Sequence, residues 1–148
     1  MIRTATTEDV PALVALAAAA YQHYLPRIGR PPAPMTADYA GAVAAGQVWV
    51  AEESGELAGL LVLIDFPDHV LVENVAVRPG SQGTGLGRRL LDHAEQHARA
   101  VGRSQLRLYT NEKMTENLAY YPRLGYRETH RGEQHGFRRV HFVKDLDG

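Results

Sequence analysis

The 148-residue chain contains no cysteine. This absence excludes disulfide frameworks, zinc sites built on cysteine and thiol nucleophiles, so a covalent mechanism would need another nucleophile. An excess of positive charge is also lacking, because 16 Lys and Arg stand against 17 Asp and Glu and the pI is near 6.7. Nucleic-acid binders usually carry a basic field. We therefore predict no polynucleotide partner.

Long apolar runs are missing as well. The longest, residues 10–21, has twelve residues, contains Pro11 and follows the acidic pair Glu8-Asp9. It is too short for a membrane span and lacks the basic leader of a signal peptide. We predict a helix here, no membrane partner and a cytoplasmic location. The length of the chain predicts one domain over residues 1–148.

What the chain does contain is an alternation of strand and helix patterns. Its apolar spacing and turn residues predict helices and strands in the order β-α-α-β-β-β-α-β-α-β-β. The predicted strands cover residues 2–5, 47–53, 57–65, 71–77, 106–109, 126–131 and 136–144. The predicted helices cover residues 7–21, 36–45, 86–101 and 114–124. Residues 25–34 hold four prolines, which predict an irregular loop.

The stretch VRPGSQGTGLGRRLL, residues 77–91, places four glycines immediately before a helical pattern. Glycines at the start of a helix suggest a phosphate site, since the unpaired N–H groups there bind anions. A P-loop is disfavoured because no lysine follows Gly85. A dinucleotide site is disfavoured because the third glycine, Gly87, comes one residue early. A pyrophosphate cradle from Gln82 to Arg89 remains.

Two segments resemble a known family. Val77-x-Pro-x-x-Gln-x-x-Gly-x-Gly87 is similar to the acyl-CoA-binding motif of the GNAT superfamily of N-acyltransferases. Tyr120-Tyr121-Pro-Arg-Leu-Gly-Tyr126 resembles the aromatic segment of that family's later helix. The family often has Asn-x-x-Ala before this segment, where Met114 and Asn117 stand here.

The resemblance implies an α/β (α+β) fold, the GNAT fold. Its central sheet is mixed and mostly antiparallel, with about six to seven strands splayed at a V-shaped cleft and about four flanking helices. It also implies acetyl-CoA as cosubstrate, bound in the cleft, and a metal-free reaction in which an amine attacks the thioester directly. The implied cofactor-binding residues are Val75, Ala76, Val77, Gln82, Gly83, Thr84, Gly85, Leu86, Gly87, Arg88, Asn117 and Tyr121.

Two residues are the candidate catalysts. Glu73 precedes Val75 and Val77 on the predicted strand, and it would act as the base that takes a proton from the amine. Strand alternation puts it on the same face as those valines unless a bulge intervenes. Tyr121, by its position in the aromatic segment, would act as the general acid. Each has a simpler interpretation: Glu73 can neutralise an arginine, and Tyr121 can be a core aromatic.

The acceptor is expected near the first helix and the loop that follows it. The candidate substrate-binding residues are Tyr21, Tyr24, Arg27, Arg30, Met35 and Glu73, and His69 and His135 lie near predicted turns. They do not distinguish a small-molecule amine from a peptide amine. A homodimer is left open, and a non-catalytic acyl-CoA-binding or sensing domain is the alternative function. His93 and His97 share a helix face but lack the glutamate of a zinc motif, so we predict no metal.

Overall fold

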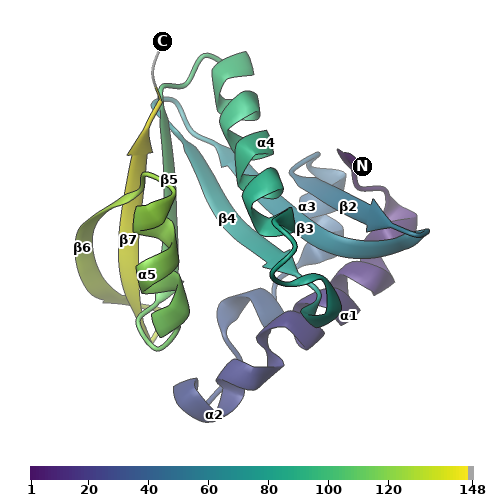
Figure 1. The fold of residues 1–148 in the computed structure, drawn as a ribbon, viewed down its shortest axis with the longest axis horizontal. Coiled ribbons are helices and arrows are strands. Elements are labelled where there is room, and N and C mark those ends of the chain that lie inside the picture. The colour runs from purple at the N-terminus through teal and green to yellow at the C-terminus, as the bar shows by residue number, and fades with distance from the viewer. Residues whose placement is uncertain (147–148) are drawn as a thin grey trace.

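The structure, a computed structural model, describes residues 1–146 (Figure 1). Its helices are α1 (Val10–Tyr21), α2 (Leu25–Ile28), α3 (Tyr39–Ala44), α4 (Leu86–Ala100) and α5 (Thr115–Arg123). Its strands are β1 (Ile2–Thr4), β2 (Val48–Glu53), β3 (Glu56–Asp65), β4 (Val70–Val77), β5 (Gln105–Asn111), β6 (Arg127–Gln134) and β7 (Phe137–Asp145). Short 3-10 turns occur at η1 (Thr7–Asp9), η2 (Gln22–Tyr24), η3 (Ala33–Met35) and η4 (Pro79–Ser81). Within residues 1–146, no helix combines the length and apolarity that crossing a membrane requires.

The strands form one mixed sheet of seven in the order β1-β2-β3-β4-β5-β7-β6. Only β4 and β5 run parallel among the neighbouring strands of residues 1–146. In Figure 1, α4 and α5 lie in front of the sheet, whereas α1 and α3 lie behind it. The predicted fold, a mostly antiparallel mixed sheet between helices, is confirmed.

Each face of the sheet has its own apolar core. On the α4 side, Leu90 of α4 packs in one cluster with Leu61 of β3 and Phe142 of β7. On the other side, Leu13 of α1 packs in a second cluster with Val50 of β2. All five side chains are at most 1% exposed. Each contributes roughly 1.5–3 kcal/mol by burial, so the helices hold both faces of the sheet in place.

The sheet opens between its two central strands. β4 and β5 pair only from Val70 to Val72 of β4, against Leu106 to Leu108 of β5. Beyond these residues the two strands diverge, as Figure 1 shows. The edges of β4 and β5 that face the opening therefore have no ladder partner within residues 1–146, and the two strands splay in the expected V shape.

A β-bulge in β4 lies at the point where the strands separate. Val62 of β3 pairs with Asn74, but the next residue, Leu63, pairs with Val72. Glu73 is consequently the extra residue on β4, and it pairs with no residue of β3. One inserted residue reverses the alternation of side chains on the remainder of the strand.

This bulge corrects the expected position of Glu73. Val72 before the bulge and Val75 and Val77 after it all belong to the α4 side of the sheet. Glu73 lies instead on the opposite face, where it lines a pocket together with Asn74. The prediction that alternation places Glu73 beside Val75 and Val77 is wrong, because the bulge intervenes.

The proline-rich segment 25–34 also differs from its prediction. It begins with the single helical turn α2, and η3 starts near its end, so it is not irregular throughout. Pro26 occupies the first turn of α2, where a missing N–H costs no helical hydrogen bond. Gly29 then ends the turn with a φ of +85°, a conformation that glycine adopts readily.

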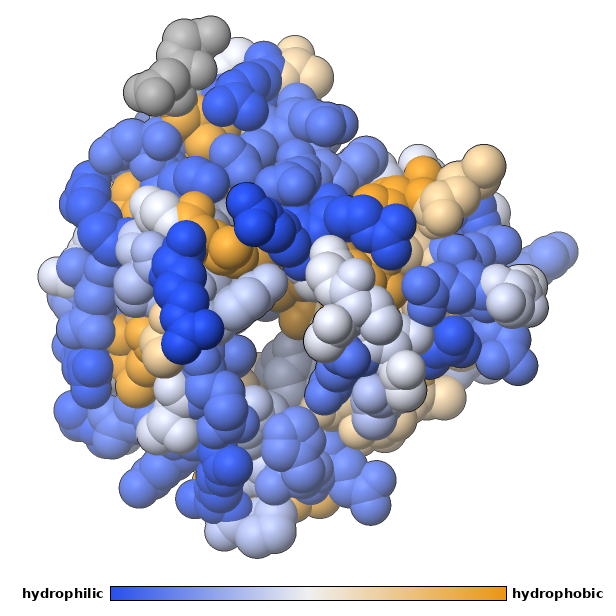
Figure 2. Space-filling view, viewed as in Figure 1, coloured by the Kyte–Doolittle hydropathy of each residue, from blue (hydrophilic) through white to orange (hydrophobic). Residues whose placement is uncertain are grey.

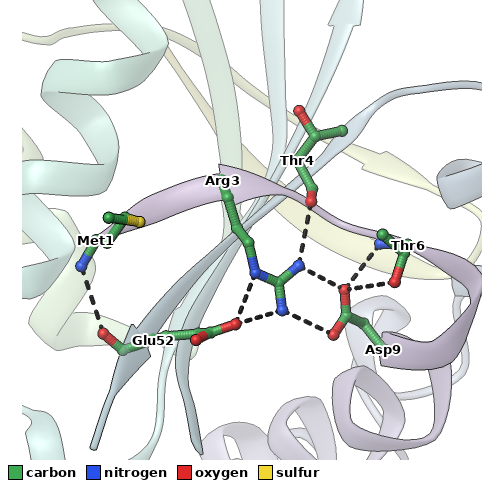
Figure 3. Close-up of polar contacts among 6 residues, drawn as sticks. All are labelled: Met1, Arg3, Thr4, Thr6, Asp9 and Glu52. Carbon is green, nitrogen blue, oxygen red and sulfur yellow. Dashed lines mark hydrogen bonds and ion pairs between the residues drawn. The ribbon is translucent and has the colours of Figure 1, made fainter. Parts of the chain in front are cut away.

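An arginine joins the edge of the sheet to the start of α1 (Figure 3). Arg3 of β1 donates from Nε to Glu52 of β2 at 2.6 Å. Its two terminal nitrogens donate to the two oxygens of Asp9 at 2.8 and 3.0 Å. These hydrogen bonds from Arg3 lower the pKa of Asp9 to about 2. Since Tyr21 is the last residue of α1, anchoring the start of the helix also positions its end over the cleft.

Candidate active site

The glycine-rich loop forms a cradle at the start of α4. Gly83 and Gly85 have φ values of +80° and +85°, and a Cβ on either would meet no atom within 4 Å. The space above the loop is therefore open, and the positive φ values favour glycine. The 15-residue helix α4 begins directly afterwards. Its first N–H groups lack helical partners and face the loop region, which is an arrangement that binds phosphate.

Polar contacts fix the approach to this loop. Arg78 donates from Nε to the Ser81 hydroxyl at 2.8 Å, and that hydroxyl donates to Glu53 of β2 at 2.7 Å. Thr84 donates its hydroxyl to the Ser81 carbonyl at 2.6 Å. These hydrogen bonds hold the loop in shape.

The register of β4 determines which backbone groups face the opening. The N–H of Arg78 donates to the Ala58 carbonyl of β3 at 2.8 Å. In an antiparallel ladder such bonds recur at every second residue. The N–H and C=O groups of Val75 and Val77 therefore point away from β3, toward the gap.

Two side-chain contacts agree with that direction. The Val75 carbonyl accepts a hydrogen bond from the Tyr21 hydroxyl at 3.1 Å. The Val77 carbonyl accepts one from Gln82 at 3.2 Å. Since pairing with β5 ends at Val72, the N–H groups of Val75 and Val77 have no strand partner among residues 1–146. They are donors available to a ligand in the cleft.

The cofactor cleft, as we call the space between β4, the glycine loop and α5, consists of two adjoining cavities of about 640 and 530 Å³. Tyr121 of α5 is 7% exposed and lines both cavities. Burial raises the pKa of its phenol, so the hydroxyl stays protonated at neutral pH. Asn117 also lines both and donates its amide to Thr110 of β5 at 3.0 Å. The lining shared by the two cavities is Val75, Ala76, Val77, Gln82, Gly83, Asn117, Tyr120, Tyr121 and Arg123.

Three other predicted cofactor residues occupy different surroundings. Gly87 and Arg88 line the cavity beside the glycine loop. Burial raises the pKa of Tyr120, and the positive charge of Arg88 opposes that shift. Leu86 is 2% exposed and packs in the core, so its backbone alone can reach the cradle.

The acceptor pocket, as we call the cavity on the opposite face, has a volume of about 430 Å³. Glu73 lines it. Burial raises the pKa values of Tyr39 and Tyr109, and the negative charge of Glu73 adds to both shifts. The full lining is Ala33, Pro34, Ala37, Asp38, Tyr39, Ala42, Gln47, Val62, Glu73, Asn74, Tyr109, His135 and Arg139. Its walls come from η3, α3, β3, β4, β5, the β6–β7 turn and β7.

A buried hydrogen-bond chain connects the two sides. The Tyr21 hydroxyl donates to Asn74 Oδ1 at 2.7 Å, and Asn74 Nδ2 donates to the Tyr39 hydroxyl at 2.8 Å. Tyr21 lines the cofactor cleft, whereas Asn74 and Tyr39 line the acceptor pocket. Figure 2 shows an opening in the middle of the molecule, at the place where β4 and α5 stand apart in Figure 1. The hydrogen-bond chain thus links the lining of the cofactor cleft to that of the acceptor pocket.

The predicted substrate residues of the first helix and its loop lie mainly outside the acceptor pocket. Tyr24 and Arg27 donate to Glu116 of α5 at 2.9 and 2.6 Å, beside the cofactor cleft. The hydrogen bond from Arg27 lowers the pKa of Glu116 to about 2. Arg30 and Met35 follow farther along the segment.

Arg30 donates to the His135 carbonyl at 3.0 Å and lies over the ring of Phe137 at 3.8 Å. It therefore holds the β6–β7 turn against the loop. His135 lines the acceptor pocket, but Met35 does not. Of the six predicted acceptor residues, all of which lie within residues 1–146, Glu73 alone lines this pocket.

Six polar residues of the acceptor pocket were not predicted from the sequence: Asp38, Tyr39, Gln47, Asn74, Tyr109 and Arg139. Arg139 is only 9% exposed. Its position directly before Val140 fits an ordinary alternation of polar and apolar residues in a strand, so the sequence did not indicate its burial.

Among residues 1–146, no group of three or more His, Asp and Glu side chains is arranged to hold a metal ion. His93 and His97 lie against the ring of Trp49, with ring centroids 5.6 and 5.1 Å away. His97 also contacts Asp65 at 2.8 Å. Both histidines are accounted for by contacts on the α4 face.

Comparison with known proteins agrees with the site geometry. The profile of the Acetyltransferase (GNAT) family matches residues 12–126, which is most of the chain. The chain therefore belongs to this family.

Relatives extend the comparison. The chain is 28% identical over 102 residues to an uncharacterized N-acetyltransferase, YvbK, of Bacillus subtilis, which covers 68% of this chain and 64% of that protein. It is 41% identical over 69 residues to N-alpha-acetyltransferase 80 of Mus musculus, covering 47% of this chain and 21% of that protein. The chain thus spans less than two thirds of the length of these relatives. The solved structure of the PaiA N-acetyltransferase from Thermoplasma acidophilum, in complex with coenzyme A, has a TM-score of 0.84 at 16% identity, covering 99% of this chain and 98% of that one. That likeness shows the fold.

Proposed function

We propose that this chain transfers an acetyl group from acetyl-CoA to a primary amine by direct attack in a ternary complex. The observation that carries the proposal is the end of β4–β5 pairing at Val72, which opens the sheet between two cavities on opposite faces. Acetyl-CoA in the cofactor cleft and an amine in the acceptor pocket can then meet through the opening between the two strands. Membership of the acetyltransferase family supports this assignment.

The cofactor cleft fits acetyl-CoA, which supplies the thioester whose acetyl group is transferred. The open space above Gly83 and Gly85 and the start of α4 suit a pyrophosphate. The free N–H groups of Val75 and Val77 suit the amides of the pantetheine arm, which would add to β4 as an extra strand does. Arg88 adds positive charge beside the loop.

Glu73 is the base of the proposed reaction. An alkylamine with a pKa of about 10.4 is only about 0.04% neutral at pH 7, so proton removal limits attack. The carboxylate lines the acceptor pocket at the point where the strands separate. It takes the first proton from the ammonium group and passes it to solvent, which leaves the neutral amine. It then takes the second proton, which the nitrogen loses as the nitrogen–carbon bond forms and the carbon–sulfur bond breaks.

Val75 and Tyr121 serve the other two atoms of the reaction. The Val75 N–H can donate to the carbonyl oxygen as negative charge develops on it. The Tyr121 hydroxyl, kept protonated by burial that raises its pKa, can protonate the departing sulfur. Solvent then returns a proton to Tyr121, and the proton on Glu73 leaves to solvent, so the protein is unchanged after each turnover.

The test is release of free thiol from acetyl-CoA over a panel of primary amines, with wild type, Glu73→Gln and Tyr121→Phe. We expect Glu73→Gln to lower kcat by about 100- to 1,000-fold, as loss of a general base does, with acetyl-CoA affinity little changed. Tyr121→Phe should lower kcat by about 10-fold, since a thiolate with a pKa of about 8.5 leaves without an acid at high pH.

Matched controls are available on the surface and in the core. Glu128→Gln removes an exposed carboxylate paired with Arg131, and Tyr126→Phe removes a buried phenol that donates to nothing in residues 1–146. Both should keep wild-type turnover. Tight binding of acetyl-CoA without thiol release for any amine would instead identify a non-catalytic acyl-CoA sensor.

A further inference from the structure

A buried arginine lies in the acceptor pocket. Arg139 of β7 is 9% exposed and lines the same cavity as Glu73. Its guanidinium carbon lies 4.2 Å from the ring centroid of Tyr109 of β5. Tyr109 thus supports the guanidinium from one face, and Tyr109 and Arg139 line the same cavity.

The charge of Arg139 has no acidic partner within residues 1–146. Its hydrogen bond to protein runs from Nη1 to the neutral Gln134 amide oxygen at 3.1 Å. The neighbouring Arg138, which is exposed, pairs with Glu112 at 3.1 Å. An exposed pair contributes little, whereas a buried charge without a partner is costly. The pocket therefore retains several N–H donors that suit an anion.

Glu73 and Arg139 form opposite poles of the pocket. Tyr109 lines the pocket together with both charged residues, and its ring lies against the Arg139 guanidinium. Burial raises the pKa of Tyr109, the charge of Arg139 lowers it and that of Glu73 raises it. Glu73 is on β4 and Arg139 on β7, the two neighbours of β5. Since β4 and β5 no longer pair beyond Val72, the backbones that carry the two charges are more than two strand spacings, about 9.6 Å, apart. One ligand can therefore engage both only if its own charges are several bonds apart.

We propose that the acceptor is an amine that also carries a carboxylate several bonds from its nitrogen, with the carboxylate held by Arg139 and the amine directed to Glu73. This inference rests on the proposed function and names its substrate class. A bidentate arginine–carboxylate pair fits the planar guanidinium and fixes the orientation of the ligand. Such a ligand can be a free amino carboxylate or a peptide whose first residue is acidic.

The test compares probes that differ in one carboxylate. Calorimetry measures binding of γ-aminobutyrate against n-butylamine, and of glutamyl-alanine amide against glutaminyl-alanine amide, with CoA present. We expect wild type to prefer the carboxylated member of at least one pair by about 10- to 100-fold, the range for a charged hydrogen-bonded pair. The pair that shows the preference identifies the source of the carboxylate. The turnover ratio within that pair should show the same preference.

Arg139→Gln should reduce this preference to within about 3-fold, and Arg139→Lys should keep part of it, because lysine retains the charge but not the planar fork. Arg138→Gln, the adjacent surface variant, should keep the full preference. A second readout is stability: Arg139→Met removes an unpaired buried charge, so it should not lower the melting temperature. Equal binding within both pairs, or a preference that survives Arg139→Gln, would overturn the inference. Binding is measured without turnover, so a protein that fails to acetylate any amine still gives a separate answer.

Discussion

The cofactor cleft and the acceptor pocket lie on opposite faces of the sheet, and they are formed by different kinds of groups. One wall of the cleft is a continuous segment, residues 75–88, which offers the backbone N–H groups of Val75 and Val77, and the other walls come from α5, the end of α1 and η2. The acceptor pocket is formed by side chains from segments as distant as Pro34 and Arg139. A backbone site is specified by spacing and glycine, whereas a side-chain site is specified by where the fold brings distant residues.

The two sites should therefore respond to different substitutions. Removing side chains around the glycine loop should matter less than altering its backbone conformation, because the anion-binding N–H groups belong to every residue. In the acceptor pocket, each contact depends on a single polar atom, so the loss of one hydroxyl or one charge should change the binding or turnover of the amine. The variants below separate these responses.

Gly85→Val should have the largest effect. Gly85 has a φ of +85°, and the position of its Cβ faces open space above the loop. Valine both disfavours that conformation and places methyl groups where the pyrophosphate would lie. We expect acetyl-CoA affinity to fall by about 100-fold or more, equivalent to about 2.7 kcal/mol, as measured by calorimetry.

Gly102→Val is the matched control for this change. Gly102 has a φ of +76°, also with no atom within 4 Å of its Cβ position, but it lies after the opposite end of α4. It should cause comparable loss of stability while leaving acetyl-CoA affinity within about 2-fold of wild type, since it introduces the same strain. Wild-type affinity in Gly85→Val would show that the pyrophosphate lies elsewhere.

Tyr21→Phe tests the connection between the two sites and should have an intermediate effect. The hydroxyl donates to Asn74 and contacts the Val75 carbonyl. Its loss leaves buried acceptors unpaired, which should lower the free energy of unfolding by about 1–2 kcal/mol. We expect kcat/KM for the amine to fall by about 3- to 10-fold, the equivalent of about 0.7–1.4 kcal/mol, with acetyl-CoA affinity less affected.

Tyr126→Phe makes the same chemical change at a hydroxyl that has no partner. The Tyr126 oxygen is buried and unbonded within residues 1–146. Removing it should leave the free energy of unfolding unchanged or raise it by up to about 1 kcal/mol. If denaturant unfolding shows the same change in the free energy of unfolding for Tyr21→Phe and Tyr126→Phe, then the hydrogen bonds of the Tyr21 hydroxyl do not stabilise the fold.

The same contrast explains what could be predicted from the sequence. Helices, strands and the glycine loop follow local rules, and the predicted stripe of α4 is buried at Leu86, Leu90, Ala94 and Ala98. The residues of the acceptor pocket follow no local rule. Tyr39, Tyr109 and Arg139 meet because α3 covers the sheet beside β4 and because β5 pairs with β7.

The bulge at Glu73 had no signal in the sequence. Nothing in the strand pattern distinguishes a regular strand from one in which Val62 and Leu63 pair with Asn74 and Val72. The alternation rule therefore gave the wrong face for Glu73. The correction supports its proposed role, since the carboxylate lies on the acceptor side, where an amine would arrive.

The smallest effect should come from Asp9→Asn, which alters neither site. The pKa of Asp9 is lowered from 3.8 to about 2, chiefly by its hydrogen bonds from Arg3. A carboxyl whose folded-state pKa is lowered stabilises the fold above its unfolded pKa, and that contribution is lost as the pH falls through the folded value. We expect Asp9→Asn to lower the free energy of unfolding by about 1 kcal/mol at pH 7, allowing for solvent screening. The difference from wild type should shrink between about pH 4 and pH 2 in urea titrations.

Glu8→Gln, at the adjacent exposed acid, should show no such loss, and turnover by both variants should equal that of wild type. A reduced turnover in Asp9→Asn, with stability unchanged, would mean that the start of α1 influences the cleft through Tyr21.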